Sequence, residues 1–90
     1  MDPHKLFDEL IGVAKKLGLE VRIQAFHGPL RSQGGLCRLN GRSIVLIDAK
    51  SSVRDRGHTL AEALASLDLE PVYIAPEARR LIEAMRGRRR

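Results

Sequence analysis

Three side chains that could bind a metal ion recur at helical spacing in the stretch DRGHTLAEALA, residues 55–65. Asp55, His58 and Glu62 are separated by three and four residues, which places them on one face of a helix. A histidine and a carboxylate four residues apart can share one zinc ion when a third ligand comes from elsewhere. The same spacing is typical of a solvated helix surface, where such a pair adds only about 0.2–0.5 kcal/mol. We expect the solvated surface, with the metal site as the alternative.

The single cysteine, Cys37, is the next candidate for chemistry. A catalytic thiol needs exposure and a neighbouring positive charge or base. Cys37 is predicted in the middle of a strand, where it would be packed, and Arg38 beside it would point to the opposite face. His27 could meet the thiol only through long-range folding, and the loop HGPLRSQGG lacks the GxxxxGK[ST] pattern of a phosphate-binding loop. We therefore expect no catalytic residue and no cofactor.

The positive charge of the chain is concentrated at its end. The net charge is +5, and the tail RGRRR holds four arginines, so the rest of the chain carries only +1. Because no aromatic side chains for base stacking accompany these arginines, we do not expect nucleic-acid binding. The basic tail consists of Arg86, Arg88, Arg89 and Arg90.

Several features favour a cytoplasmic protein that does not enter a membrane. The longest aliphatic run, IVLI at 44–47, is much shorter than the roughly 20 apolar residues of a membrane span. The first residues, MDPHKLFDEL, lack the basic and apolar regions of a signal peptide. A lone cysteine also fits a reducing compartment.

The first third of the chain predicts a helix, a strand and a loop. An Asp-Pro pair before apolar residues at helical spacing, with a glycine after them, predicts a helix over 3–17. Alternating apolar and polar residues in LEVRIQAF predict a half-buried strand over 19–26. The Gly-, Pro- and Ser-rich segment 27–35 is interpreted as an irregular, mobile loop.

The pair Asn40-Gly41 predicts a tight hairpin, because both residues tolerate the positive φ angles of a type I′ turn. Two strands, 35–39 and 42–48, should therefore pair across it. This register places Cys37 opposite Ile44, Leu39 opposite Arg42, and Leu36 opposite Val45.

Both faces of the predicted strand 42–48 are partly apolar. Such a strand is normally covered on both sides, yet a chain of 90 residues has few helices to cover it. The C-terminal helix or another subunit would close the second face, so we expect either a protein partner or a homodimer. The expected contact surface is this second face, with Leu36, Val45 and Ile47. The alternative contact surface is the loop 27–35.

The second half of the chain predicts two further helices. Clustered leucines predict one over 52–67, and Pro76 and Gly87 bound the other. The connector between them is extended, with room for a short strand at 72–74. The order α-β-β-β-α-(β)-α predicts an α+β fold with a small three-stranded sheet, in a single domain over 1–86 followed by a basic tail over 87–90.

The order of elements and the segments GGLCRLNGRSIVLID and RDRGHTLAEALASL resemble the core of the ImmA/IrrE-type zinc metallopeptidases. Members of that family carry a helix of the form Arg-x-x-Phe-Thr-Leu-Ala-His-Glu-Leu-Gly-His. The resemblance covers roughly residues 3–67 and implies a peptidase-like scaffold. The matching positions on the helix are Thr59, Leu60, Ala61 and Leu64.

The positions that carry chemistry in that family differ in this chain. Glu62 stands where the first zinc-binding histidine would be, Ala63 replaces the catalytic glutamate, and Ser66 replaces the second histidine. Alanine cannot act as a general base for a zinc-bound water. The sequence therefore predicts a non-catalytic protein-interaction or regulatory domain. The alternative is a metal-dependent hydrolase with an atypical site at His58 and Glu62.

Overall fold

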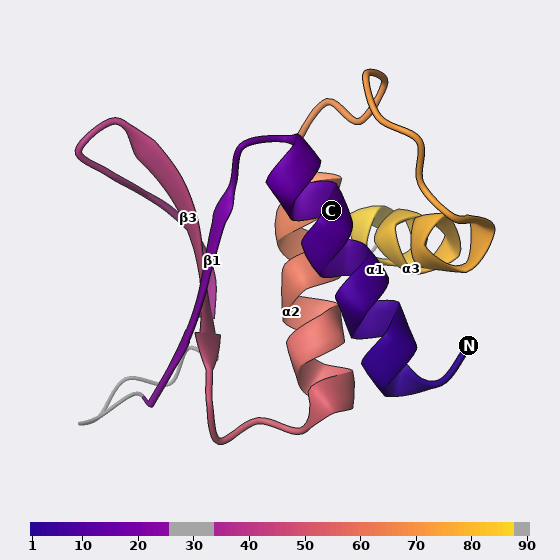
Figure 1. The fold of residues 1–90 in the computed structure, drawn as a ribbon, viewed down its shortest axis with the longest axis horizontal. Helices are drawn as coiled ribbons and strands as arrows, with labels where there is room; N and C mark the ends of the chain where they lie inside the picture. Colours follow the sequence, from indigo (N-terminus) through magenta and orange to yellow (C-terminus); the bar gives the residue numbers. More distant parts are fainter. Residues whose placement is uncertain (26–33, 88–90) are drawn as a thin grey trace.

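A three-stranded sheet lies beside three helices in the computed structural model, which describes residues 1–25 and 34–87 (Figure 1). This arrangement confirms the predicted α+β class and the order of the six main elements. Their bounds are α1 Pro3–Lys16, β1 Glu20–Gln24, β2 Gly34–Leu39, β3 Arg42–Asp48, α2 Val53–Ala65 and α3 Pro76–Gly87.

Strand β3 is the centre of the sheet, whose strand order is β1-β3-β2. It pairs in parallel with β1 and antiparallel with β2. Asn40 and Gly41 turn the hairpin with φ angles of 53° and 80°, as the type I′ turn requires. The predicted hairpin register is confirmed, including the pairing of Cys37 with Ile44.

Side chains at the helix starts fix where α1 and α2 begin. The Asp2 carboxylate accepts a hydrogen bond from the backbone N–H of Lys5 at 3.0 Å. The Ser52 hydroxyl accepts one from the backbone N–H of Asp55 at 3.1 Å. Each cap satisfies an N–H group that the helix itself leaves without a partner. At the other end of α1, Gly18 adopts a φ of 78°, which allows the chain to turn toward β1.

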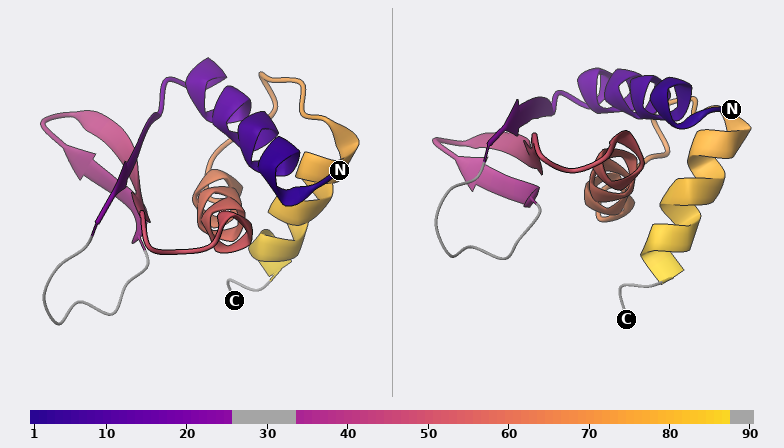
Figure 2. Two further views of the ribbon diagram at one scale, coloured as in Figure 1. Left: turned by 60° about the horizontal axis from the view of Figure 1, so that its bottom comes forward. Right: turned by 90° about the horizontal axis from the view of Figure 1, so that it is seen from below.

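Helix α2 forms the middle layer of the molecule. It contacts β2 and β3 on one side, and α1 and α3 on the other, while α1 also reaches β1 (Figure 2). The hydrophobic core fills the space between the sheet and this helix and continues between the three helices. Its fully buried large side chains are Leu10, Val45, Ile47, Leu60, Leu64 and Ile82.

The connector between α2 and α3 does not contain the short strand predicted at 72–74. Ile74 is buried in the core, whereas Tyr73 is 75% exposed. The connector runs beside the helices and away from the sheet (Figure 1), so it has no strand edge with which to pair. Its apolar residues therefore anchor an irregular segment.

Two further expectations concern the predicted loop 27–35 and membrane-spanning segments. Most of the predicted loop 27–35 lies outside the described residues, although Gly34 and Gly35 begin β2. None of the described helices combines the length and apolar content needed to cross a membrane.

Candidate functional site

The two faces of the sheet have different surroundings. The inner face packs on the helices, and its apolar residues in β3, Val45 and Ile47, have no exposed surface. On the opposite side no helix of the described chain covers the strands (Figures 1 and 2). We call this side the outer face. By strand pairing and alternation it consists of Glu20, Arg22, Gln24, Gly35, Cys37, Leu39, Arg42, Ile44, Leu46 and Asp48.

The predicted contact surface at Leu36, Val45 and Ile47 is therefore wrong for two of its three residues. Helix α2 covers Val45 and Ile47, which are both 0% exposed. Leu36 shares their face at the border of the sheet and is 37% exposed. The face that the helices leave open is the other one.

Apolar and thiol side chains run across the middle of the outer face. Ile44 lies in this strip but is only 1% exposed. Leu46 is half-buried, Cys37 is exposed, and Leu39 is 51% exposed. We call these residues of β2 and β3 the apolar strip of the outer face. They are Cys37, Leu39, Ile44 and Leu46.

Charged residues border this strip. Arg22 Nε donates a hydrogen bond to Glu20 Oε2 at 2.5 Å, and Arg42 Nη1 lies 3.6 Å from Glu20 Oε1. The hydrogen bond from Arg22 lowers the pKa of the Glu20 carboxyl, and the same bond raises the pKa of Arg22. Glu20 therefore stays ionised and holds two guanidinium groups at the edge of the strip.

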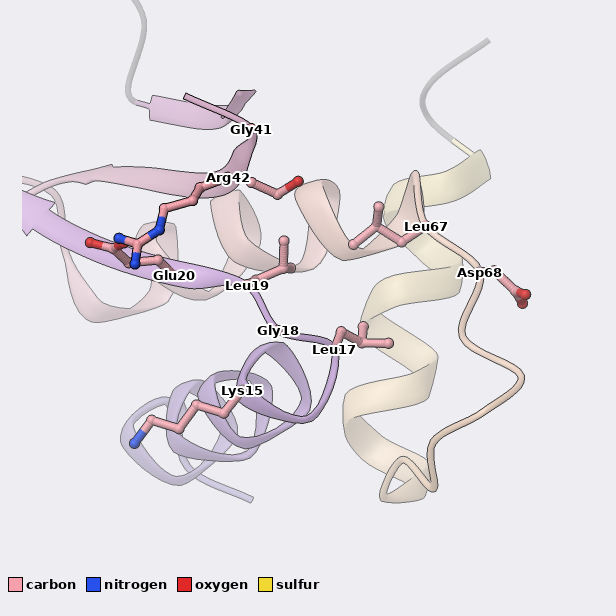
Figure 3. Close-up of a pocket in the computed structure, with 10 residues that line it drawn as sticks. Lys15, Leu17, Gly18, Leu19, Glu20, Gly41, Arg42, Leu67 and Asp68 are labelled. Atoms are coloured by element: carbon pink, nitrogen blue, oxygen red, sulfur yellow. The ribbon is translucent and has the colours of Figure 1, made fainter. Parts of the chain in front are cut away.

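A cleft of about 680 Å³ opens beside this ion-pair network, at the end of the sheet where β1 and β3 begin (Figure 3). Lys15 and Arg42 line it together with Glu20 and Asp68. Both α1 and α2 end near the cleft, and cations such as Lys15 compensate the negative end of a helix dipole. Lys15 therefore has a structural role at the end of α1, and Arg42 is placed beside the cleft by its ion pair with Glu20.

The described lining of this cleft does not assemble a reactive group. Ser43 supplies a hydroxyl, but no described lining residue is a histidine or a cysteine that could activate it or act in its place. The cleft also lies at the amino ends of the parallel strands, whereas open α/β sheets bind ligands at the carboxyl ends. We assign the cleft no reaction.

The predicted metal ligands Asp55, His58 and Glu62 all lie on α2. His58 is half-buried and lines a cavity of about 220 Å³ with Met1, Leu6 and other mainly apolar residues, whereas Asp55 and Glu62 are exposed. Within residues 1–25 and 34–87, no three His, Cys, Asp or Glu side chains are grouped so that they could hold a metal ion.

Cys37 lies in mid-strand as predicted, but it is exposed rather than packed. Its thiol is on the outer face, while His58 lies among the helices on the other side of the sheet. These two residues therefore do not converge. His27 lies outside the described residues.

On α2, the residues at the chemical positions of the metallopeptidase pattern serve the fold. Ala63 is 4% exposed and belongs to the core. The Ser66 hydroxyl donates a hydrogen bond to the Ala63 carbonyl at 2.7 Å, which satisfies a backbone acceptor at the end of the helix. Glu62 faces the solvent.

Arg86 is part of the fold rather than of a tail. It lies in α3, and its Nε donates a hydrogen bond to the Ala65 carbonyl at 3.2 Å, at the end of α2. Its Nη1 also contacts the Glu83 carboxylate at 3.0 Å. Arg88, Arg89 and Arg90 lie outside the described residues.

Comparisons of the chain with protein-family models, with curated proteins and with solved structures found no match. The resemblance to zinc metallopeptidases therefore stays a prediction, carried by the residues quoted for it.

Proposed function

We propose that this protein is a non-catalytic protein-interaction domain of the cytoplasm, and that the outer face of its sheet is the contact surface. One observation carries the proposal: the helices described in the structure all lie on the inner side, so that none of them covers the apolar strip of the outer face. The peptidase-like scaffold implied by the sequence resemblance is compatible with this role, since positions 62, 63 and 66 lack the chemistry of that family.

The composition of the outer face matches the anatomy of protein interfaces. Such interfaces combine an apolar centre with a polar rim, and arginine is enriched in them. Here Leu39 and Leu46 provide apolar surface, and Arg22 and Arg42 lie at the border. Covering the strip would remove apolar area from water, at a gain of about 25 cal/mol per Å².

The metal-dependent hydrolase at His58 and Glu62 receives less support. Its third ligand is missing among the described residues, because no metal-binding group is assembled there. His58 instead contacts a mainly apolar cavity.

The natural cysteine allows a direct test. A benzophenone-maleimide probe is attached to Cys37 on the outer face. In a second protein that carries Cys37→Ser, it is attached to Tyr73→Cys, an exposed position on the connector between α2 and α3. Proteins cross-linked from position 37 and not from position 73 are then purified and titrated with the domain. We expect Leu39→Asp to weaken this binding at least tenfold and Tyr73→Asp to leave it unchanged. Equal binding by the two variants would overturn the proposal.

A further inference from the structure

We propose that the partner of the outer face is a second copy of this chain, packed face to face with its β3 antiparallel to the first β3. This inference rests on the proposed function, because it names the partner of the same surface. It follows from the order of residue types along the three strands. When this order is reversed in a facing copy, cations lie opposite carboxylates and apolar residues lie opposite apolar residues.

The pattern is clearest on β3. Its outer-face residues, in order, are Arg42, Ile44, Leu46 and Asp48. We place a two-fold axis in the plane of the interface, at a right angle to β3 and level with residue 45. Rotation about this axis reverses the order of these residues in the second copy. Arg42 then faces the partner's Asp48, and Ile44 faces the partner's Leu46. Each cation meets a carboxylate, and the exposed part of Leu46 packs over the partner's Ile44, which is itself only 1% exposed.

The same axis gives a complementary pair on β1. Strand pairing places Glu20 level with Ile44 and Arg22 level with Leu46. Reversal therefore brings Glu20 opposite the partner's Arg22, and Arg22 opposite the partner's Glu20. Within one chain Glu20 already holds two guanidinium groups, so its charge is in place before the copies meet.

Strand β2 supplies a match of shape. Cys37 is level with Ile44 and Gly35 with Leu46, so the axis places Cys37 opposite the partner's Gly35. The space that a side chain at Gly35 would occupy is open, with no atom of the described residues within 4 Å. The partner's thiol can enter this space without displacing anything.

The charges disfavour a face-to-face dimer in which the two copies of β3 are parallel. A two-fold axis parallel to the strands would place Arg42 opposite the partner's Arg42 and Asp48 opposite the partner's Asp48. Like charges directly opposite each other are destabilising. Sheets that pack face to face are about 10 Å apart and rotated by about 30°, which long arginine side chains at the border can accommodate.

The size of the outer face predicts a weak dimer. Three strands about 4.8 Å apart, with the longest seven residues long, cover roughly 14 Å by 23 Å. This is well below the roughly 800 Å² per partner of a standard interface. We therefore expect a dissociation constant between about 1 µM and 1 mM, and a dimer that forms only in concentrated solution.

Two charge reversals test both the partner and the orientation. Arg42→Asp gives a chain with two carboxylates at the ends of β3, and Asp48→Arg gives one with two guanidinium groups. Each variant alone should be monomeric in sedimentation equilibrium at concentrations up to about 2 mM, whereas the unmodified chain approaches twice its 10.0 kDa mass. An equal mixture of the two variants should form a heterodimer, because both end pairs are then restored.

Controls separate this effect from damage to the fold. The reversals Arg80→Asp on α3 and Asp8→Arg on α1 lie at exposed positions on the helices, and should leave dimerisation unchanged. Because Asp48 accepts a hydrogen bond from the Lys50 N–H, circular dichroism checks that its variant folds. If the Asp48→Arg variant does not fold, the mixing test is repeated on β1 with the variants Glu20→Arg and Arg22→Glu.

Three results would overturn the dimer: an unmodified chain that stays monomeric at about 2 mM, reversals that leave its association unchanged, or variants that do not recombine on mixing. A monomer that still binds another protein through Leu39 would overturn the dimer and leave the proposed function standing. If the chain is monomeric and no protein captured by the Cys37 probe binds in a way that depends on Leu39, both the dimer and the proposed function are overturned.

Discussion

Arg22 and Glu20 lie two residues apart on the same face of β1, and the Arg22 guanidinium donates a hydrogen bond to the Glu20 carboxylate at 2.5 Å. This contact makes the charges of the outer face part of the folded structure. Glu20 also lies 3.6 Å from Arg42, so one carboxylate connects two neighbouring strands. The pair has a consequence for the stability of the fold at low pH.

Because Arg22 lowers the pKa of Glu20 in the folded chain, ionised Glu20 stabilises that state relative to the unfolded one. This contribution is fully present above the unfolded pKa of about 4.5 and is lost as pH falls through the lower folded value. We expect unmodified protein to exceed Glu20→Gln in free energy of unfolding at pH 7, with the difference shrinking below about pH 4.5. Urea unfolding at pH 7, 5 and 3 measures it, and a difference that grows on acidification would contradict the assignment.

The assignment of the two sheet faces makes a prediction about two apolar residues. Ile47 is fully buried against the helices, and Leu39 is 51% exposed on the outer face. Ile47→Ala should lower the free energy of unfolding by about 2–5 kcal/mol, because it removes buried methyl groups and leaves a cavity. Leu39→Ala should change it by less than about 0.5 kcal/mol at a dilution where the protein is monomeric. Similar losses for both variants would mean that the outer face is also covered within one chain.

These two faces show how far the sequence could predict the site. The hairpin register was predictable because Asn40-Gly41 is a local signal that sets the pairing of β2 with β3. The sequence could not predict which face the helices cover. The four consecutive apolar residues Ile44, Val45, Leu46 and Ile47 place apolar side chains on both faces of the strand. Helix α2 makes that choice through tertiary packing, which alternation along a strand does not encode.

The charged border of the outer face escaped prediction for a related reason. Glu20 and Arg22 look like the ordinary polar side of a half-buried strand. Their positions level with Ile44 and Leu46 depend on the parallel pairing of β1 with β3, which joins segments more than 20 residues apart. The alternation of polar residues at 20, 22 and 24 was the available signal, but it carried no information about the neighbouring strand.

Arg86 provides a test of the junction between α2 and α3. Its guanidinium donates to the Ala65 carbonyl at the end of α2 and pairs with Glu83 one turn earlier on α3. Arg86→Ala should lower the free energy of unfolding by about 1 kcal/mol, since a backbone acceptor loses its partner. The matched change Arg80→Ala, at an exposed position of the same helix, should have no measurable effect in urea unfolding. Equal effects would assign Arg86 to a solvated tail after all.

The environment of His58 leads to the last prediction, which concerns zinc. His58 lines a mainly apolar cavity of about 220 Å³, and the described residues bring no second and third ligand to it. Protein purified without an affinity tag should therefore contain no stoichiometric zinc by elemental mass spectrometry. Added zinc at 100 µM should shift the melting temperature by less than about 2 °C, whereas a site with a dissociation constant of 1 µM would stabilise the fold by about 2.7 kcal/mol and raise it by more than about 10 °C. A shift of that size in the unmodified protein, absent in His58→Ala and retained in His4→Ala, would identify a metal centre at His58 and revive the hydrolase.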